Sequence, residues 1–174
     1  MRSILLILLF SLSAYANNQT YVLKSSEVSY KVDFPLKTVY GKSSDSKGKG
    51  VCDKKSCDFL IAVPVKSFKS GDTNRDVHMQ EVTKESQYPL LTVNSTFSDP
   101  DNITEIDLEI DFAGVKKTIK KLKLSKNKTD RVIEINSTFP ILLSEFKINR
   151  PSLLGVSIDD KVEIDVKTKW ELAP

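Results

Sequence analysis

The segment VEIDVKTKW, residues 162–170, gives the plainest indication of the fold. Its apolar residues, which alternate with charged or polar ones, are Val162, Ile164, Val166 and Trp170. Successive side chains of a β-strand point to opposite faces, so this period predicts a strand with one apolar face and one solvated face. Strands of this kind are typical of antiparallel sheets.

The same two-residue period recurs through most of the preceding chain. Its apolar members are Tyr30, Val32 and Phe34, then Phe59, Ile61, Val63 and Val65, then Leu91, Val93 and Phe97, and finally Ile106, Leu108, Ile110 and Phe112. Turn-forming stretches at residues 45–48, 98–102 and 126–130 separate these segments. About eight strands are therefore expected in one all-β domain. Because their apolar faces must be covered, we expect an antiparallel β-barrel, which also removes exposed sheet edges.

Residues 71–82, GDTNRDVHMQEV, break the strand period and predict a short helix. Asp72, Thr73 or Asn74 can cap this helix, and Asp76 in its first turn suits the helix dipole. One helical face carries residues three or four positions apart, namely Arg75, His78, Met79 and Val82. The helix is expected to cover one end of the barrel.

His78 is the only histidine in the chain, and several kinds of chemistry can be set aside for it. A calcium loop over residues 72–83 fails because Val77 stands where that loop needs glycine. A zinc site lacks ligands, and no sequence signature marks a nucleophile. We therefore expect no metal, no cofactor and no catalytic residue. Two interpretations stay open: His78 packs within its helical face, or His78 and Arg75 bind a polar head group at the mouth of a cavity.

Cys52 and Cys57 are the only cysteines, and four residues separate them. In an exported protein such a pair most simply forms a disulfide, because a metal site would need two further soft ligands. The spacing suits a hairpin loop with the cysteines paired across its strands. We expect a structural bridge that stabilises the fold by about 2 kcal/mol.

The first sixteen residues, MRSILLILLFSLSAYA, have the layout of a secretory signal peptide that ends in a small-residue cleavage site. Their apolar run is shorter than the roughly 20 residues that a membrane-spanning helix needs. We expect cleavage to leave one domain, residues 17–174, which is periplasmic or secreted. Basic and acidic residues are interspersed and the formal net charge is only +3, which argues against a nucleic-acid partner.

Four segments, in order, resemble the YceI-like family of bacterial exported proteins. They are YVLKSSEVSYKVDF (residues 21–34), VPVKSFKSGDTNRDVHMQEVTKESQYPLLTV (63–93), IDFAGVKKTIKKLKL (110–124) and FPILLSEFKINRPSLLGVSIDDKVEIDVKTKWEL (139–172). The second is the strongest, because it has the apolar strand, the Arg-Asp-x-His-Met segment and the Tyr-Pro pair of the family. The chain departs from the family in its first-strand region, where Ser26, Tyr30 and Lys37 stand in place of frequent histidines, and in its cysteine loop.

The resemblance implies a lipocalin-like barrel around a long apolar cavity that holds a polyisoprenoid or a similar long-chain amphiphile, such as a prenylated quinone. The inward residues expected to line the cavity are Tyr30, Val32, Ile61, Val63, Val93, Phe97, Leu108, Ile110, Phe112, Phe139, Val162, Ile164, Val166 and Trp170. Arg75 and His78 are expected to hold the head group near the mouth. An exported lipid-binding protein or carrier is the leading hypothesis, because a dry cavity spares about 0.8 kcal/mol for each CH₂ group otherwise exposed to water.

Two other functions stay open. A stress-related structural barrel could be filled by its own side chains, since alternation also reflects simple core packing. An enzyme could act on a bound lipid through His78 and a carboxylate. We expect any membrane contact to be transient, and the sequence leaves the oligomeric state open between a monomer and a homodimer.

Overall fold

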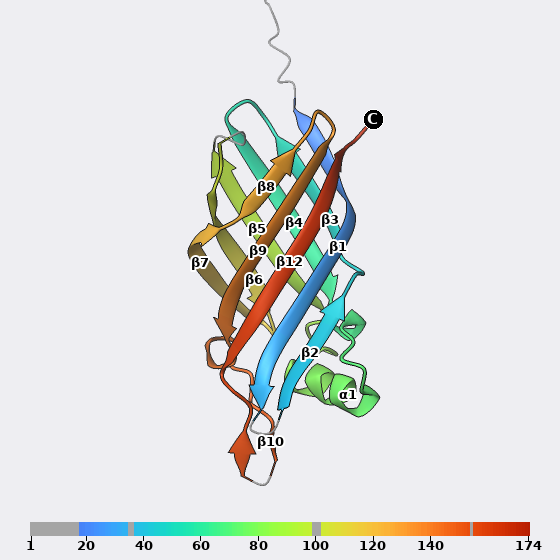
Figure 1. Cartoon of the computed structure of the whole chain (residues 1–174), viewed down its shortest axis with the longest axis vertical. Helices are drawn as coiled ribbons and strands as arrows, with labels where there is room; N and C mark the ends of the chain where they lie inside the picture. Colours follow the sequence, from blue (N-terminus) through green and yellow to red (C-terminus); the bar gives the residue numbers. More distant parts are fainter. Residues whose placement is uncertain (1–17, 35–36, 99–101, 154) are drawn as a thin grey trace, which may run out of the picture.

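The computed structural model describes residues 18–34, 37–98, 102–153 and 155–174, so the expected signal peptide lies outside the described residues. Ten strands form one curled antiparallel sheet (Figure 1). They are β1 (Gln19–Phe34), β2 (Lys37–Ser43), β3 (Lys47–Cys52), β4 (Ser56–Pro64), β5 (Leu90–Ser98), β6 (Glu105–Phe112), β7 (Val115–Lys123), β8 (Ser125–Lys128), β9 (Val132–Leu142) and β12 (Lys161–Leu172). Their order is β7-β6-β5-β4-β3-β1-β12-β9-β8, and β2 pairs with β1.

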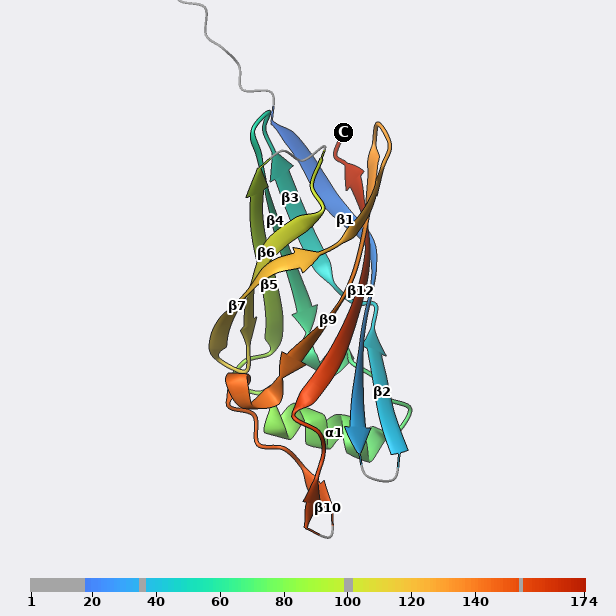
Figure 2. The same cartoon turned by 60° about the vertical axis from the view of Figure 1, so that its left-hand side comes forward.

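The strands at the two ends of this order, β7 and β8, are consecutive in the chain and only Leu124 separates them. β7 pairs with β6 whereas β8 pairs with β9, so residues 115–128 connect one side of the sheet to the other. The hydroxyl of Ser137 in β9 also donates to the backbone carbonyl of Lys123, at 2.8 Å. The sheet thus curls into a barrel (Figure 2), which confirms the lipocalin-like antiparallel architecture expected from the sequence.

The barrel has ten strands where the alternation predicted about eight. Residues 37–52 form two strands, β2 and β3, close to the turn expected at residues 45–48. A difference from the expected count is the division of residues 115–128 into β7 and β8. There Ile119 and Leu122 both pack on the core although they are three positions apart, because a bulge at Lys121, with φ 54°, shifts the register against β6. A bulge breaks the two-residue period on which the strand count relied.

Two groups of buried side chains occupy the two ends of the barrel. At the end covered by the helix, Val32, Phe139 and Val162 belong to one large cluster. At the opposite end, Tyr21, Phe59 and Trp170 form a second cluster together with both cysteines. The long β1 reaches both ends, since it pairs with β12 from Tyr21 to Val32. A third, smaller cluster is formed by Val28, Val63 and Phe68.

The predicted helix is present as α1 (Thr73–Val82), and it lies across the lower end of the barrel (Figure 2). Asp72 is its N-cap, because the Asp72 carboxylate accepts a hydrogen bond from the backbone N–H of Arg75 at 3.1 Å. Asp76 is in the first turn as expected, but its side chain is buried and accepts hydrogen bonds from the N–H and the hydroxyl of Ser70, at 2.9 and 2.6 Å. These bonds fix the start of α1 against the preceding loop.

The remaining elements accompany α1 at this end of the barrel (Figure 1). They are the 3₁₀ turns η1 (Val65–Ser67) and η2 (Leu143–Phe146) and the small hairpin of β10 (Ser152–Leu153) and β11 (Val156–Ser157). Within the described ranges, no helix has the length and apolarity needed to cross a bilayer.

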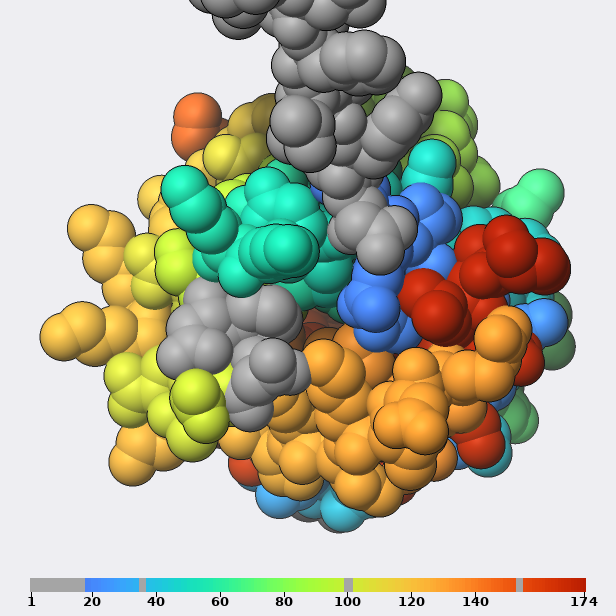
Figure 3. Space-filling view, turned by 90° about the horizontal axis from the view of Figure 1, so that it is seen from above, coloured from blue at the N-terminus to red at the C-terminus, as the bar shows by residue number. Residues whose placement is uncertain are grey.

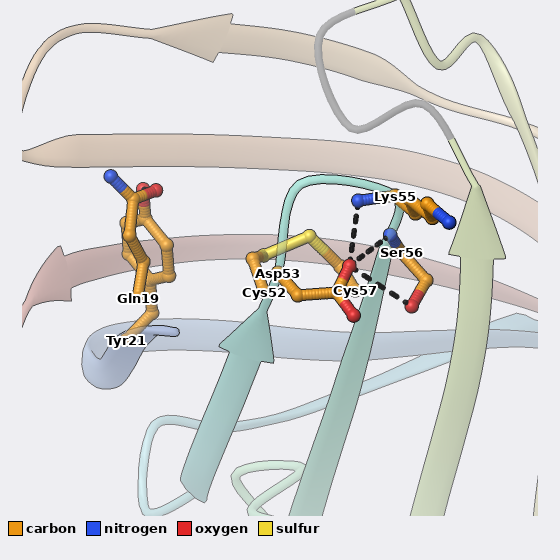
Figure 4. The surroundings of a disulfide bond; sticks show 7 residues. All are labelled: Gln19, Tyr21, Cys52, Asp53, Lys55, Ser56 and Cys57. Atoms are coloured by element: carbon orange, nitrogen blue, oxygen red, sulfur yellow. Dashed lines mark hydrogen bonds between the residues drawn. A yellow bond between two sulfur atoms is a disulfide. The ribbon is translucent and has the colours of Figure 1, made fainter. Parts of the chain in front are cut away.

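The predicted disulfide between Cys52 and Cys57 is confirmed (Figure 4). The two cysteines are direct partners in the β3–β4 hairpin, with their Cα atoms 4.0 Å apart. In the intervening loop, Asp53 accepts hydrogen bonds from the backbone N–H groups of Lys55 and Ser56, at 2.6 and 2.7 Å. These bonds hold the pKa of Asp53 below its ordinary value. The loop is therefore held both by the disulfide and by the hydrogen bonds to Asp53.

Candidate functional site

A cavity of about 430 Å³ extends along the inside of the barrel. This volume is within the range of roughly 300–1,000 Å³ found for small-molecule sites. All the residues predicted to line a cavity lie on its wall: Tyr30, Val32, Ile61, Val63, Val93, Phe97, Leu108, Ile110, Phe112, Phe139, Val162, Ile164, Val166 and Trp170. Arg75 and His78 also lie on its wall, at the α1 end.

Side-chain exposure along β12 shows where the barrel is hollow. Val162 and Trp170 near its two ends are buried, whereas Ile164 and Val166 between them are only partly buried. All four belong to the wall of the cavity, so the partly exposed pair borders the open space while it also packs against buried neighbours. The barrel is therefore not filled by its own side chains, which removes the main support for a purely structural role.

Three serine and threonine hydroxyls on the wall offer little to a polar ligand. The hydroxyl of Ser95 donates to the carbonyl of Asp107 at 2.8 Å, and that of Thr168 donates to the carbonyl of Ile135 at 3.2 Å. The hydroxyl of Ser137 likewise donates to the backbone carbonyl of Lys123, at 2.8 Å. A hydroxyl already bonded to the backbone need not bond to a guest, so the middle of the cavity suits a hydrocarbon.

Aromatic side chains fill the end of the barrel that carries the disulfide. The ring of Phe59 lies 6.2 Å from that of Tyr21, 5.7 Å from that of Phe97 and 4.7 Å from that of Trp170. The indole N–H of Trp170 donates to the Thr168 hydroxyl at 3.0 Å. Viewed from outside, the β3–β4 hairpin, the β8–β9 turn and the C-terminal residues gather around this end (Figure 3). This end is thus densely packed.

Two aromatic rings on the cavity wall each lie against a glycine of the neighbouring strand. Gly41 pairs with Tyr30 across β1 and β2, and Gly50 pairs with Phe59 across β3 and β4. In each pair the aromatic ring lies so close to the glycine that an added Cβ atom would overlap it. Each ring can therefore lie flat against the sheet instead of projecting into the cavity.

The α1 end is the polar end of the cavity, but its two predicted head-group residues already have partners. A guanidinium nitrogen of Arg75 lies 3.3 Å from the Asp72 carboxylate, and Nδ1 of His78 lies 3.2 Å from the Glu81 carboxylate. The His78 side chain is 54% exposed, so it is not packed within the helical face. The backbone N–H of Arg75, and then its side chain, hold the pKa of Asp72 below the ordinary value.

Tyr30 has a polar role that the sequence did not indicate. Among the described residues, its hydroxyl has no hydrogen-bond partner, although its ring lies on the cavity wall. Burial, and then the negative charge of Asp76, raise the pKa of this hydroxyl. Tyr30 therefore keeps its proton and can donate it to an acceptor on a guest. The alternation pattern identified only the inward direction of Tyr30.

A second, more open pocket of about 470 Å³ adjoins the α1 end. It is lined by His78, Glu81, Val82, Lys84, Lys147 and Asn149, and we call it the vestibule. It shares His78 and Val82 with the inner cavity, so α1 contributes to the walls of both spaces. No sequence signal pointed to its two lysines, because each lies in a turn rather than in a periodic segment.

Comparison with known proteins agrees with this geometry. The family model of the YceI-like domain matches residues 20–170. A polyisoprenoid binding domain from Saccharophagus degradans, implicated in plant cell wall breakdown, is 13% identical and has a TM-score of 0.73 over 88% of this chain and 98% of its own. BcnA of Burkholderia cenocepacia is 16% identical, with a TM-score of 0.71 over 83% of this chain and 95% of its own.

A third similar structure is the YCEI protein of Campylobacter jejuni, at 18% identity and a TM-score of 0.60, which covers 82% of this chain and 89% of its own. No curated protein sequence matches the chain. At these identities the structural likeness supports the fold, while the family match rests on the sequence itself.

Proposed function

Because this chain belongs to the YceI-like family, we propose that it binds a polyisoprenoid or a similar long-chain amphiphile inside its barrel. The observation that carries the proposal is the apolar cavity, whose central side chains Ile164 and Val166 are only partly buried. Each CH₂ group that leaves water for such a cavity contributes about 0.8 kcal/mol. A relative of the same fold, from Saccharophagus degradans, is a polyisoprenoid binding domain.

The polar end of the guest belongs at α1 in this proposal. Tyr30, Arg75 and His78 lie on the wall at that end, whereas the opposite end is packed with aromatic rings. Tyr30 can donate a hydrogen bond to an oxygen of the head group, and Arg75 and His78 flank it. A binding protein is favoured over an enzyme, because the interior hydroxyls of Ser95 and Thr168 are bonded to backbone carbonyls rather than to a base.

We also propose export to an oxidising compartment, either the periplasm or the medium. The disulfide supports this, because disulfides persist in such compartments. The mature domain would then be residues 17–174, and the mass of the protein recovered from the periplasm or the medium tests that boundary. A mass that includes residues 1–16 would contradict it.

Transient contact with a membrane fits a lipid carrier of this form. Large exposed apolar side chains lie at the α1 end, among them Val77, Leu142 and Val156. A homodimer stays a prediction, and the sedimentation of the purified domain tests it against a monomer.

The cavity proposal is tested by blocking the barrel interior. Val93 faces the cavity and its neighbour Asn94 is exposed on the outer face of β5. We expect wild-type protein to release a lipid on organic extraction and mass spectrometry. Val93→Trp should lose this lipid because the indole occupies its space, whereas the matched control Asn94→Trp should keep it.

Thermal unfolding of both variants shows whether each one is folded. Two results would contradict the proposal: a folded Val93→Trp protein with a full complement of lipid, or a wild-type protein that releases no lipid and binds no added prenyl quinone.

A further inference from the structure

The cavity ends at three aromatic rings, those of Phe59, Phe97 and Trp170, which we call the floor. All three belong to the cavity wall at the end of the barrel that carries the disulfide. Tyr21 and Cys52 are part of the same buried cluster, yet neither is among the described residues that line the cavity. The cavity therefore does not continue past the floor.

Two glycines of β3 receive the rings of the floor. Gly48 lies against Trp170, and Gly50 lies against Phe59, in each case so closely that an added Cβ atom would overlap the ring. Glycine within a strand often marks such a close approach. The two rings thus lie directly on the backbone of β3.

Hydrogen bonds and the disulfide also hold the floor in place. The indole N–H of Trp170 donates to the Thr168 hydroxyl at 3.0 Å, and this hydroxyl donates to a carbonyl of β9 at 3.2 Å. The Cys52–Cys57 disulfide links the two strands of the hairpin that carries Phe59. The rings therefore have little freedom to move aside for a guest.

The distance between the floor and the α1 end limits the length of a guest chain. Val162, near the α1 end, and Trp170 are both on the wall and are eight positions apart in β12. At about 3.3 Å per residue and a strand tilt of roughly 40°, this separation is about 20 Å along the barrel axis. An isoprene unit has four main-chain carbon–carbon bonds of about 1.5 Å, and their zigzag advances roughly 5 Å. About four units therefore fit above the floor.

The volume of the cavity gives a similar limit and leaves no room for a second chain. The cavity measures about 430 Å³. A methylene group takes up about the same volume as a molecule of liquid water, roughly 30 Å³. The cavity thus holds about 14 carbons, close to three isoprene units. A lipid with two such chains would need about twice this space.

We propose that the floor sets the length of the guest: the cavity accepts a single isoprenoid chain of about three or four units, whose far end contacts Phe59 and Trp170. The inference rests on the proposed function and narrows the ligand class by chain length and chain number. Once the cavity is full, further units stay in water, so longer chains gain no more affinity from burial.

The contact with the floor can be tested directly, because Trp170 is the only tryptophan of the chain. Bromine quenches tryptophan fluorescence on contact. Saturating ω-bromohexadecanol should quench Trp170 at least threefold more strongly than ω-bromo-octanol, whose bromine stops short of the floor while its hydroxyl stays in water. The matched control is the hexadecanol isomer with bromine beside its hydroxyl, which should quench as little as the octanol does.

The length limit is tested with dissociation constants for geraniol, farnesol, geranylgeraniol and geranylfarnesol. For the wild type we expect affinity to rise at least tenfold from geraniol to farnesol, and less than about twofold from geranylgeraniol to geranylfarnesol. Phe97→Ala removes one ring of the floor, so geranylfarnesol should then bind at least about fivefold more tightly than geranylgeraniol. The control Phe112→Ala removes a wall ring near η2, far from the floor, and should keep the wild-type limit. Thermal unfolding verifies that both variants fold.

The inference is overturned if ω-bromohexadecanol quenches no more than its isomer, or if wild-type affinity keeps rising tenfold with the fifth unit. An unchanged limit in folded Phe97→Ala would also contradict it, as would a dialkyl glycerol that competes as well as geranylgeraniol. In all these cases the proposed lipid binding still stands. If neither a prenyl alcohol nor a prenyl quinone binds the wild type, the proposed function itself fails.

Discussion

Single residues decide how much of the barrel interior stays open. Tyr30 has a bulky ring that points into the barrel, yet Gly41 on the paired strand lets that ring lie against the sheet. Glycine within a strand usually weakens it, and it often marks a place where another group approaches closely. At Gly41 the approaching group is an aromatic ring, so the shape of the cavity depends on a residue without a side chain.

We predict that Gly41→Ala reduces lipid binding and stability together. The new Cβ atom would push the Tyr30 ring toward the cavity, and such overpacking typically costs about 1–3 kcal/mol. Bound lipid per protein by mass spectrometry and the free energy of unfolding measure both effects. In a Tyr30→Ala background the same substitution should cost little. An equal cost in both backgrounds would show that the ring is not the cause.

Asp160 is a second residue with a local role of its own. Its carboxylate accepts hydrogen bonds from the hydroxyl and the backbone N–H of Ser144, at 2.6 and 2.8 Å, and so joins η2 to the start of β12. The Ser144 hydroxyl, and then the N–H, hold the pKa of Asp160 below its ordinary value. The lowered pKa means that the folded protein favours the ionised carboxylate more than the unfolded chain does.

We predict that Asp160→Ala lowers the free energy of unfolding by about 1 kcal/mol at neutral pH, a small value because the pair is exposed. The ionic part of this contribution is complete above the ordinary carboxyl pKa of about 4. It disappears as the pH falls through the lower pKa of the folded state. Urea unfolding at a series of pH values measures it, and a difference that grows toward acid would contradict the assignment.

At the scale of the elements, the β3–β4 hairpin is held by the Cys52–Cys57 disulfide in addition to the hydrogen bonds between its strands. Cys52 and Cys57 pair in register, and both are buried beside the aromatic cluster. We predict that Cys52→Ala/Cys57→Ala lowers the free energy of unfolding by about 2 kcal/mol, because the reduced chain gains freedom when unfolded. Denaturant titration measures the loss, and adding reductant to the wild type should reproduce most of it. A variant as stable as the oxidised protein would show that the strands suffice.

Elements were predictable from the sequence where a single period runs from end to end. β12 alternates without interruption, and α1 has both a capping aspartate and a helical face, so the sequence identified each of them. The sequence did not predict the division into β7 and β8, because the bulge at Lys121 places Ile119 and Leu122 on the core only three residues apart. Periodicity reports which side of a strand is buried, and it fails where the backbone changes register.

The candidate functional site was likewise only partly predictable from the sequence. The cavity wall followed from alternation and from the family resemblance, since every inward residue predicted lies on it. Lys84 and Lys147 belong to turns, and lysines in turns are ordinary on any protein surface. Only the three-dimensional structure shows that these two share one vestibule. The buried bonds of Asp76 to Ser70 are likewise tertiary and leave no pattern in the sequence.

At the scale of the whole molecule, the two ends of the barrel differ. One end is packed by Tyr21, Phe59 and Trp170 and tied by the disulfide, whereas the other carries α1, the vestibule and the β10–β11 hairpin. Exposed apolar side chains are present at this second end: Leu142 at the end of β9 is 39% exposed, and Val156 in the hairpin is 50% exposed. We propose that a guest from a membrane passes through the α1 end, because the opposite end is packed with aromatic rings.

We predict that Leu142→Gln/Val156→Gln slows the uptake of a fluorescent prenyl lipid from vesicles by about tenfold, because the variant loses apolar area that inserts into the membrane surface. The matched control is Val22→Gln/Leu60→Gln, which changes side chains that are similarly exposed, 44% and 51%, on the barrel wall away from α1. The control should take up lipid at the wild-type rate, and both variants should bind dissolved farnesol normally. Equal slowing in the two variants would mean that general surface apolarity, and not the α1 end, governs contact with the membrane.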